Sequence, residues 1–145
     1  MKLKDISFDN LQFTKSKQLF GIVYNVSPCL EFQTPKVIVS QLYKENDKNY
    51  LVLELIGNES CVKFYQRIME LEEIFKKKAN SLTSIFSGGR FTVKIDNVKI
   101  FSNGDLVGSV EKGQQVICFM RIDKLWVTEY NECSYFPLVK EIKVI

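Results

Sequence analysis

The sequence of 145 residues contains no histidine, the side chain that enzymes use most often near neutral pH. Histidine is the commonest general base, a frequent partner of nucleophilic serine or cysteine, and the commonest metal ligand. The carboxylates are scattered among lysines, without a close pair that would suit two-metal or acid–base chemistry. We therefore predict that the protein is not an enzyme. Catalysis by cysteine, lysine or carboxylates is the weakest alternative.

The cysteines and glycines do not form a recognisable metal or phosphate site. Cys29, Cys61, Cys118 and Cys133 are widely separated, and no C-x-x-C pair occurs. We expect four free, mostly buried thiols, with an all-cysteine metal site as a minor alternative. The segment SGGR at residues 87–90 lacks the spacing of both common nucleotide-binding motifs, so we interpret it as a turn before a strand. No cofactor is predicted.

Long hydrophobic runs are also missing. No stretch approaches the roughly 20 apolar residues that a membrane-spanning helix needs. Residues 1–5 lack the apolar run of a signal peptide. We expect an intracellular protein with no membrane partner. If the protein is viral, the expected location is the host cytoplasm or a viral factory.

The excess of positive over negative charge is small. The formal net charge is +3, and Arg67, Arg90 and Arg121 are the only arginines. Two-pronged recognition of bases or phosphates by guanidinium groups therefore has few candidates. Such a charge neither requires nor opposes nucleic-acid binding, which depends on whether the lysines gather on one face.

What the chain has in quantity is β-forming and aromatic residues. Apolar residues make up 46% of the sequence, including 11 Phe and 6 Tyr, which is enough for the core of one domain over residues 1–145. Alternating or continuous apolar runs predict strands, with a hairpin turn at residues 44–49 and a weaker element between Gly108 and Gly113. The strands are expected at residues 6–13, 20–26, 36–43, 50–56, 90–95, 98–101, 116–127 (bent or bulged) and 138–145.

One segment has the period of a helix instead. Apolar residues from Phe64 to Phe75 recur at helical spacing, residues 57–60 supply a strand breaker and an N-cap candidate, and three lysines at residues 76–78 suit a helix C-terminus. We interpret Glu72 and Glu73 as part of the solvated face. The predicted class is mostly β (α+β), with one central amphipathic helix.

Aromatic and basic residues are interleaved in the second half of the chain. Proteins that bind single strands use such residues together, because a base stacks on a ring while Lys or Arg contacts the phosphate. The predicted binding residues are Lys36, Arg90, Phe91, Lys94, Lys99, Phe101, Arg121, Lys124, Trp126 and Tyr130. The alternative for Phe91, Phe101 and Phe119 is a place in the core, and Trp126 suits either the surface or the core.

The order of these elements carries a resemblance. With the strings TPKV (34–37), GQQVIC (113–118), KLWV (124–127) and FPLVKEIKV (136–144), residues 30–145 resemble small OB-like proteins of nucleocytoplasmic large DNA viruses. That family is regarded as binding single-stranded DNA. The resemblance implies a five-stranded, partly open antiparallel barrel whose strand face and loops grip extended nucleic acid.

Two functions from different classes follow. The first is sequence-tolerant binding of a single-stranded nucleic acid, with DNA favoured, by aromatic stacking and Lys/Arg phosphate contacts. The small net charge and single Trp predict modest affinity with a shallow salt dependence. The alternative is a non-catalytic protein-interaction or virion structural module that uses a strand edge or the helix, and a homo-oligomer stays open.

Overall fold

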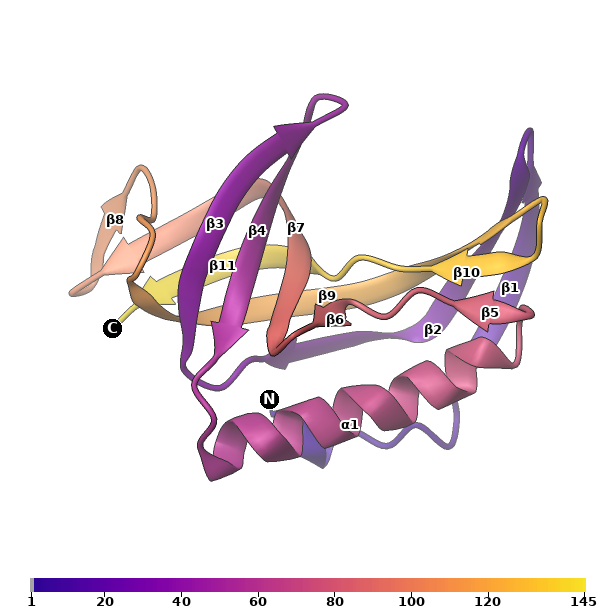
Figure 1. The fold of residues 1–145 in the computed structure, drawn as a ribbon, viewed down its shortest axis with the longest axis horizontal. Coiled ribbons are helices and arrows are strands. Elements are labelled where there is room, and N and C mark those ends of the chain that lie inside the picture. Colours follow the sequence, from indigo (N-terminus) through magenta and orange to yellow (C-terminus); the bar gives the residue numbers. More distant parts are fainter. Residues whose placement is uncertain (1) are drawn as a thin grey trace.

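The computed structural model of the protein describes residues 2–145. Within this range the chain forms eleven strands, one α-helix and one short 3-10 helix (Figure 1). Their order is η1 (Leu3–Asp5), β1 (Gln12–Gln18), β2 (Gly21–Gln33), β3 (Val37–Glu45), β4 (Lys48–Leu55), α1 (Glu59–Lys76), β5 (Ser81–Leu82), β6 (Phe86–Ser87), β7 (Arg90–Ser102), β8 (Asp105–Val107), β9 (Gln115–Thr128), β10 (Glu132–Ser134) and β11 (Leu138–Val144).

Five strands close into a barrel in the order β3-β4-β7-β11-β9, and β9 returns to pair with β3. This is an OB-like fold, and the predicted class, mostly β with one helix, is confirmed. Two details of the prediction were wrong. The barrel is closed, through the pairs Val37–Val116 and Ile38–Gln115. In addition, β11 runs parallel to β7, whereas the other pairs of barrel strands are antiparallel.

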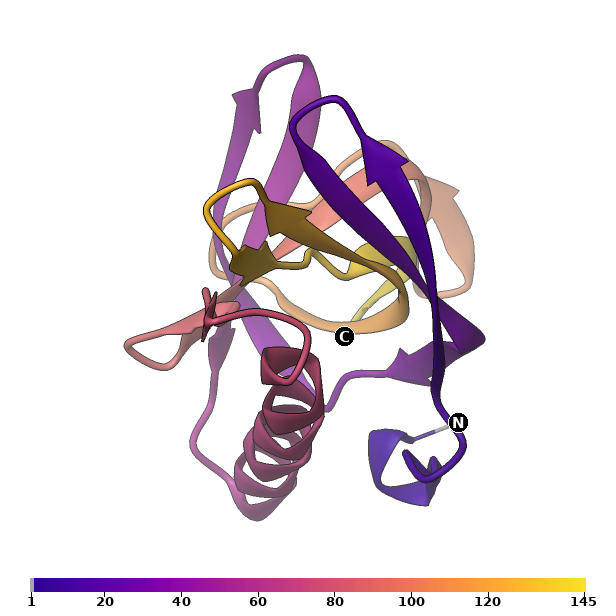
Figure 2. The ribbon, with the colours of Figure 1, turned by 90° about the vertical axis from the view of Figure 1, so that its right-hand side faces the viewer.

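A second group of strands extends beyond the barrel, and we call it the wing. It consists of β1, β2, residues 122–128 of β9, β10 and β5, and its strands are hydrogen-bonded in the order β1-β2-β9-β10-β5. The β1–β2 hairpin of the wing and the β3–β4 hairpin of the barrel rise from the same side of the molecule, opposite α1 (Figures 1 and 2).

The helix closes the underside of both parts. Asn58 caps its N-terminus by accepting a hydrogen bond from the backbone N–H of Cys61 at 2.9 Å. The predicted stripe of Phe64, Ile68, Leu71 and Phe75 is buried against the sheet. Full burial of such a side chain contributes about 1.5–3 kcal/mol, so this stripe fixes the helix to the barrel and the wing.

The segment at residues 6–13 is not the predicted strand. The chain there leaves η1 and becomes extended and paired only from Gln12. Its apolar residues have another role, since Phe8 is buried and the guanidinium of Arg67 on α1 lies 3.8 Å from the centroid of the Phe8 ring. The spacing of these apolar residues therefore does not reflect strand alternation. Phe8 and Phe13 contact α1, through Arg67 and Phe75.

The other predicted strands are found, with shifted ends, except that the strands expected at residues 90–95 and 98–101 form the single strand β7. β9 is one long strand, as the apolar run predicted. Its pairing with β2 shifts register between Asn25 and Leu30, where residues 26–29 of β2 lie against the single residue 123 of β9, so the irregularity lies mainly in β2 and not in β9 as expected. Between Gly108 and Gly113, where a weak element was expected, no strand forms. The short strand β8 ends just before this segment, at Val107.

The cysteines are free thiols, and all but the half-buried Cys29 are buried, as predicted. Residues 2–145 include no group of three or more Cys, Asp or Glu side chains that could hold a metal ion. In the same range, the single α-helix is too polar to be a membrane-spanning segment.

Candidate nucleic-acid interface

A row of laterally paired residues crosses the outer face of the barrel. Tyr43 on β3 lies opposite Tyr50 on β4, which lies opposite Lys94 on β7, and Lys94 is followed by Leu138 on β11 and Arg121 on β9. Directly paired residues share a face of the sheet, and the neighbouring row is the buried one. This row therefore places two aromatic rings and two cations on the outside of adjacent strands.

The rings at the start of this row form a small cluster with a third ring. The centroids of Tyr43 and Tyr50 are 5.2 Å apart and their planes differ by 20°, so the two rings are stacked. Phe136, from the connection between β10 and β11, lies 5.5 Å from Tyr50 and is 50% exposed. We call Tyr43, Tyr50 and Phe136 the aromatic cluster. It offers ring surface to solvent at the point where three elements meet.

The Tyr50 hydroxyl stays uncharged near neutral pH. Burial raises its pKa above the usual 10, and the nearby Glu45 carboxylate and Tyr43 raise it further. The central ring of the cluster is therefore a neutral stacking surface near neutral pH.

Polar residues surround the cluster at the tip of the β3–β4 hairpin. Asn46 and Asp47 have φ values of 51° and 62°, which the tightest hairpin turns require at both central positions. The flanking Lys44 and Lys48 are exposed, and Lys48 lies opposite Glu45. This tip can donate hydrogen bonds to a phosphate and form ion pairs with it, although its acidic residues offset part of the lysine charge.

Exposed residues continue from the cluster toward the wing. Trp126 on β9 is 49% exposed and pairs with Ser134 on β10. Cys133 and Tyr135 are buried while Ser134 and Phe136 are not, so this segment alternates between two faces. Trp126 and Phe136 consequently face the same side.

The buried Tyr135 fixes the connection that carries Phe136. Its hydroxyl donates a hydrogen bond to Glu72 on α1, and the Glu72 carboxylate also accepts from the Ser84 hydroxyl at 3.1 Å and the Ile85 N–H at 3.4 Å. Burial and the adjacent Glu72 carboxylate raise the pKa of Tyr135 well above 10. The prediction that Glu72 is solvated was wrong, because this carboxylate is only 3% exposed and replaces water with three donors.

Phe91 does not belong to the interface. It is 1% exposed and its ring lies 5.6 Å from Phe64 and 5.3 Å from Phe86, inside the barrel and against α1. The strand period explains this, since Phe91 and Val93 alternate with Arg90, Thr92 and Lys94. A ring enclosed in the core has no face for a base, so its inclusion among the binding residues was wrong.

The remaining predicted residues of β7 and β9 lie on the outer face, but several have acidic neighbours. Arg90 pairs with Glu54 at 3.3 Å. Arg121 lies between Asp123, at 3.4 Å, and Glu31, at 4.0 Å. Their charges are therefore partly compensated. Farther along the barrel, the exposed Lys99 lies opposite Glu141 in the register of β7 and β11, and Phe101 is half-buried.

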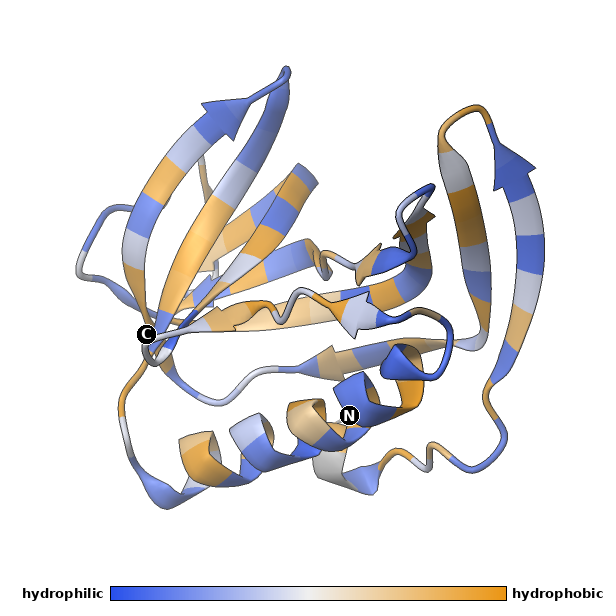
Figure 3. Cartoon of the chain, turned by 45° about the vertical axis from the view of Figure 1, so that its right-hand side comes forward, coloured by the Kyte–Doolittle hydropathy of each residue, from blue (hydrophilic) through white to orange (hydrophobic). Residues whose placement is uncertain are grey.

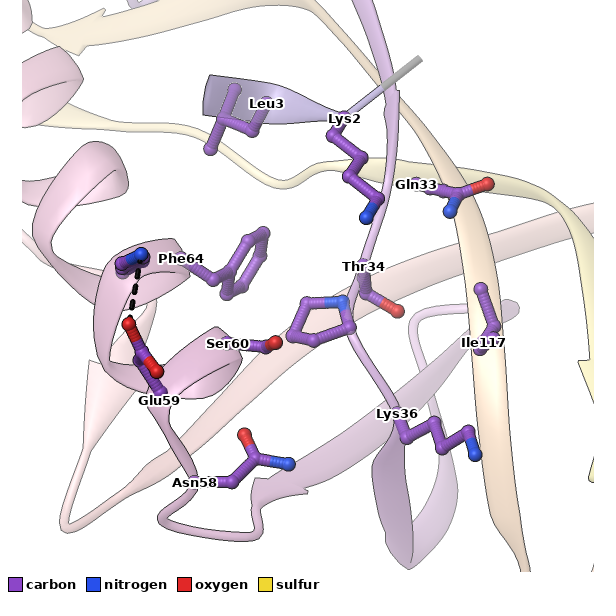
Figure 4. A pocket seen from close by; sticks show the side chains of 12 residues that line it. Lys2, Leu3, Gln33, Thr34, Lys36, Asn58, Glu59, Ser60, Phe64 and Ile117 are labelled. Carbon is purple, nitrogen blue, oxygen red and sulfur yellow. Dashed lines mark ion pairs between the residues drawn. The ribbon is translucent and has the colours of Figure 1, made fainter. Parts of the chain in front are cut away.

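Lys36 occupies a different place. It lines a pocket of about 530 Å³ between the start of α1 and the β2–β3 connection, together with Lys2 and Lys63 (Figure 4). Lys63 is already paired with Glu59 at 2.9 Å. Seven strand positions separate Lys36 from Tyr43, roughly 23 Å along β3. The structure does not bring Lys36 together with the aromatic cluster.

Lys124, Trp126 and Tyr130 lie on or beside the wing and are all exposed. Lys124 precedes Trp126 by two residues on β9, and Tyr130 stands in the turn from β9 to β10 with 77% of its surface exposed. Sequence reasoning missed the aromatic cluster itself. A signal was present, because pairing across the expected hairpin of residues 36–56 puts Tyr43 opposite Tyr50.

Solved structures with this arrangement of strands exist. The chain is similar in fold to phage single-stranded-DNA-binding proteins. Two structures of the single-stranded DNA-binding protein from bacteriophage Enc34 match with 12% identity and cover 92% of this chain. The C-terminally truncated form has a TM-score of 0.61 over 94% of its chain, and the other form 0.60 over 89%.

A third match is gp2.5, a single-stranded DNA-binding protein encoded by bacteriophage T7. It has a TM-score of 0.57 and 11% identity, over 79% of this chain and 91% of its own. No protein-family model matches the sequence, and no curated protein is significantly similar to it. Nothing in these comparisons links the chain to nucleocytoplasmic large DNA viruses.

Proposed function

We propose that the protein binds single-stranded DNA, without strong sequence preference, across the face that carries the aromatic cluster. The observation that carries this proposal is the position of the cluster. OB barrels bind oligonucleotides on their second and third strands and on the loops that join strands one to two and four to five. In this barrel those parts are β4, β7, the β3–β4 turn and the β9–β11 connection, and the cluster lies at their junction.

The proposed contacts divide into rings and cations. Bases stack on the aromatic cluster and on Trp126, and each stacked base is worth about 1–3 kcal/mol. Lys94, Lys124 and the lysines of the β3–β4 tip contact phosphates. Stacking does not read the base edge, so the binding tolerates any sequence. The fold similarity to phage proteins supports DNA as the ligand. It also supports the proposal that this protein acts inside a cell.

Binding of fluorescein-labelled oligo-dT at low salt, followed by anisotropy, tests the proposal. We expect saturable binding by the wild type and quenching of Trp126 fluorescence in the same titration. Tyr50→Ala should weaken binding about tenfold or more, because it removes the central ring of the cluster. The control is Tyr65→Ala, an exposed tyrosine on α1 at the opposite side of the molecule, which should bind like the wild type.

Two results would contradict the proposal. One is the absence of any anisotropy change with the wild type. The other is equal binding by Tyr50→Ala and the wild type. Either result, combined with a stable oligomer in light scattering, would favour the protein-interaction alternative.

That alternative has weaker support in the structure. β1 is an edge strand whose residues are all at least partly exposed, which is the usual site of strand addition by a partner. However, β1 carries Lys15 and Lys17, and lysines on edge strands oppose pairing with another strand. The edge therefore does not present a clear docking site for protein.

A further inference from the structure

The end of the wing is apolar and exposed to an unusual degree. Leu19 and Phe20, in the turn between β1 and β2, are 88% and 73% exposed. Tyr130, in the neighbouring β9–β10 turn, is 77% exposed. The two turns are adjacent because Gly21 pairs with Thr128. We call Leu19, Phe20 and Tyr130 the wing tip.

The wing tip is held in a fixed position. β1 and β2 form seven consecutive register pairs, and β2 continues this pairing with β9. At Gly21 the hairpin lies so close to β9 that an added Cβ would be 2.3 Å from the carbonyl oxygen of Val127. The exposed rings are therefore presented by a hydrogen-bonded scaffold. Grouped exposed apolar side chains of this kind mark sites that bind a partner.

The wing tip continues the face that we propose for DNA. Its hairpin rises on the same side as the β3–β4 hairpin (Figures 1 and 2). Trp126 lies between the two ends, because it pairs with Val23, two residues from Gly21, and faces the same side as Phe136. Tyr43, Tyr50, Phe136 and Trp126 thus lead from the barrel toward the hairpin that carries Phe20.

We propose that the wing tip is a second contact for the same single strand of DNA, taking bases beyond those on the barrel. This inference rests on the proposed function. An unpaired strand presents apolar base faces, which suit Phe20, Tyr130 and Leu19, and a charged backbone, which does not. The cation on this face is Lys124, which precedes Trp126 by two residues on β9. Lys15 and Lys17 on β1 pair with Tyr24 and Ile22 and therefore lie on the opposite face, the one that packs on α1. Glu129 and Glu132 flank Tyr130. The phosphates therefore lie toward Lys124 and the bases toward the apolar side chains of the wing tip.

The length of the oligonucleotide tests this inference. From Arg121, in the row of the aromatic cluster, to Thr128 beside the wing tip is about 23 Å along β9. The nucleotides of a short strand are used up by stacking on the aromatic cluster, so few are left to cover this distance to the tip. We expect the double variant Leu19→Ser with Phe20→Ser to bind a dT oligomer of about 5 nucleotides like the wild type, and one of about 16 nucleotides about tenfold more weakly.

Two variants serve as comparisons. Tyr50→Ala should weaken binding of both oligomers, because it acts on the barrel. Leu106→Ser removes another exposed apolar residue, 67% exposed on β8, and should leave both affinities unchanged. All of these side chains are at least partly exposed, and melting curves verify that each variant folds.

The outcomes separate the inference from the proposed function. If the wild type binds neither oligomer, the proposed function fails and the inference fails with it. If the wild type and Tyr50→Ala behave as expected but the wing-tip variant binds the longer oligomer normally, only the inference is overturned. A wing-tip variant that loses a dimer in light scattering while keeping its affinity also overturns it, and shows that the tip contacts a second copy of the chain.

Discussion

The two hairpins that rise from this molecule have the same shape and opposite chemistry. The tip of the β3–β4 hairpin is polar and that of the β1–β2 hairpin is apolar, blue and orange respectively in Figure 3. In the barrel hairpin, Val39, Leu51 and Leu53 are fully buried, so the core explains its hydrophobic residues. In the wing hairpin, Leu19 and Phe20 are largely exposed and lie outside the core. The core accounts for the apolar residues of the first hairpin but not for the exposed apolar tip of the second, for which we propose a bound partner.

We propose that the two hairpins contact different parts of one bound DNA strand. Polar groups at the β3–β4 tip suit the backbone, and the rings below them suit a few bases. The wing tip has rings and an aliphatic side chain beyond the reach of the barrel. A barrel that acts alone would have no use for them, so separating the wing from the barrel is the most direct way to break the comparison.

Gly21→Ala should have the largest effect, because it forces the wing hairpin away from β9. The added Cβ would meet the backbone of Val127 and Thr128, which cannot rotate out of the way as a side chain could. We expect destabilisation by about 3 kcal/mol, the upper end for overpacking, measured by urea denaturation. Gly108→Ala is the matched control, since nothing lies within 4 Å of its Cβ position. Equal stability of the two variants would show that the hairpin is loosely attached.

Tyr135→Phe should have the next largest effect, and it acts where the barrel and the wing meet. The variant leaves the buried Glu72 with two donors instead of three, which costs about 1–3 kcal/mol. The binding of short oligomers should also weaken, because Phe136 follows Tyr135 directly. Tyr130→Phe removes an exposed hydroxyl and should leave stability unchanged. If both variants melt alike, Glu72 does not hold the connection.

Unfolding at alkaline pH tests whether the barrel and the wing differ in the stability of their cores as well as in the chemistry of their tips. Burial raises the pKa of Cys118, in the barrel, to about 12, and burial with nearby Glu72 raises that of Cys133, in the wing, to about 12. A raised thiol pKa favours the protonated form in the folded state. The resulting stability is complete below pH 9 and is lost as pH rises from 9 toward 12.

We expect one unfolding transition at every pH, with a loss of about 1 kcal/mol between pH 8 and pH 10 from each of the two thiols, and Cys118→Ala should remove about half of the total. Chemical denaturation monitored by Trp126 fluorescence, for the wing, and by far-ultraviolet circular dichroism, for the whole sheet, measures it. Transitions that separate at high pH would show that the parts unfold independently.

The sequence predicted the parts of the fold that a local period determines. The stripe from Phe64 to Phe75, the hairpin at residues 36–56 and the long bent β9 are all visible as patterns of spacing. What it could not predict depends on distant contacts. Glu72 looks solvated beside Glu73 until Tyr135, 63 residues later, reaches it. The closure of the barrel rests on two register pairs between β3 and β9, for which no local pattern exists.

The candidate site follows the same division. Alternation along β7 could have assigned Phe91 to the core, because it shares the period of the buried Val93. Pairing across the hairpin could have brought Tyr43 to Tyr50. Phe136 could not have been added to them, because it joins the cluster from a connection whose course depends on Tyr135 and α1.

The smallest expected effect is a difference between the two hairpin tips in how DNA affinity depends on salt concentration. If the β3–β4 tip contacts phosphates, Lys44→Gln with Lys48→Gln should reduce the slope of log affinity against log salt by about 0.7 for each phosphate that the variant no longer neutralises. The wing-tip variant Leu19→Ser with Phe20→Ser should lower the affinity for long oligomers at every salt concentration and leave the slope unchanged, because stacked bases release no counterions. Anisotropy titrations at several salt concentrations measure both slopes. Equal slopes for the wild type and the lysine variant would show that the polar tip does not contact the backbone, and the cations of the wing and of β7 would then carry the whole salt dependence.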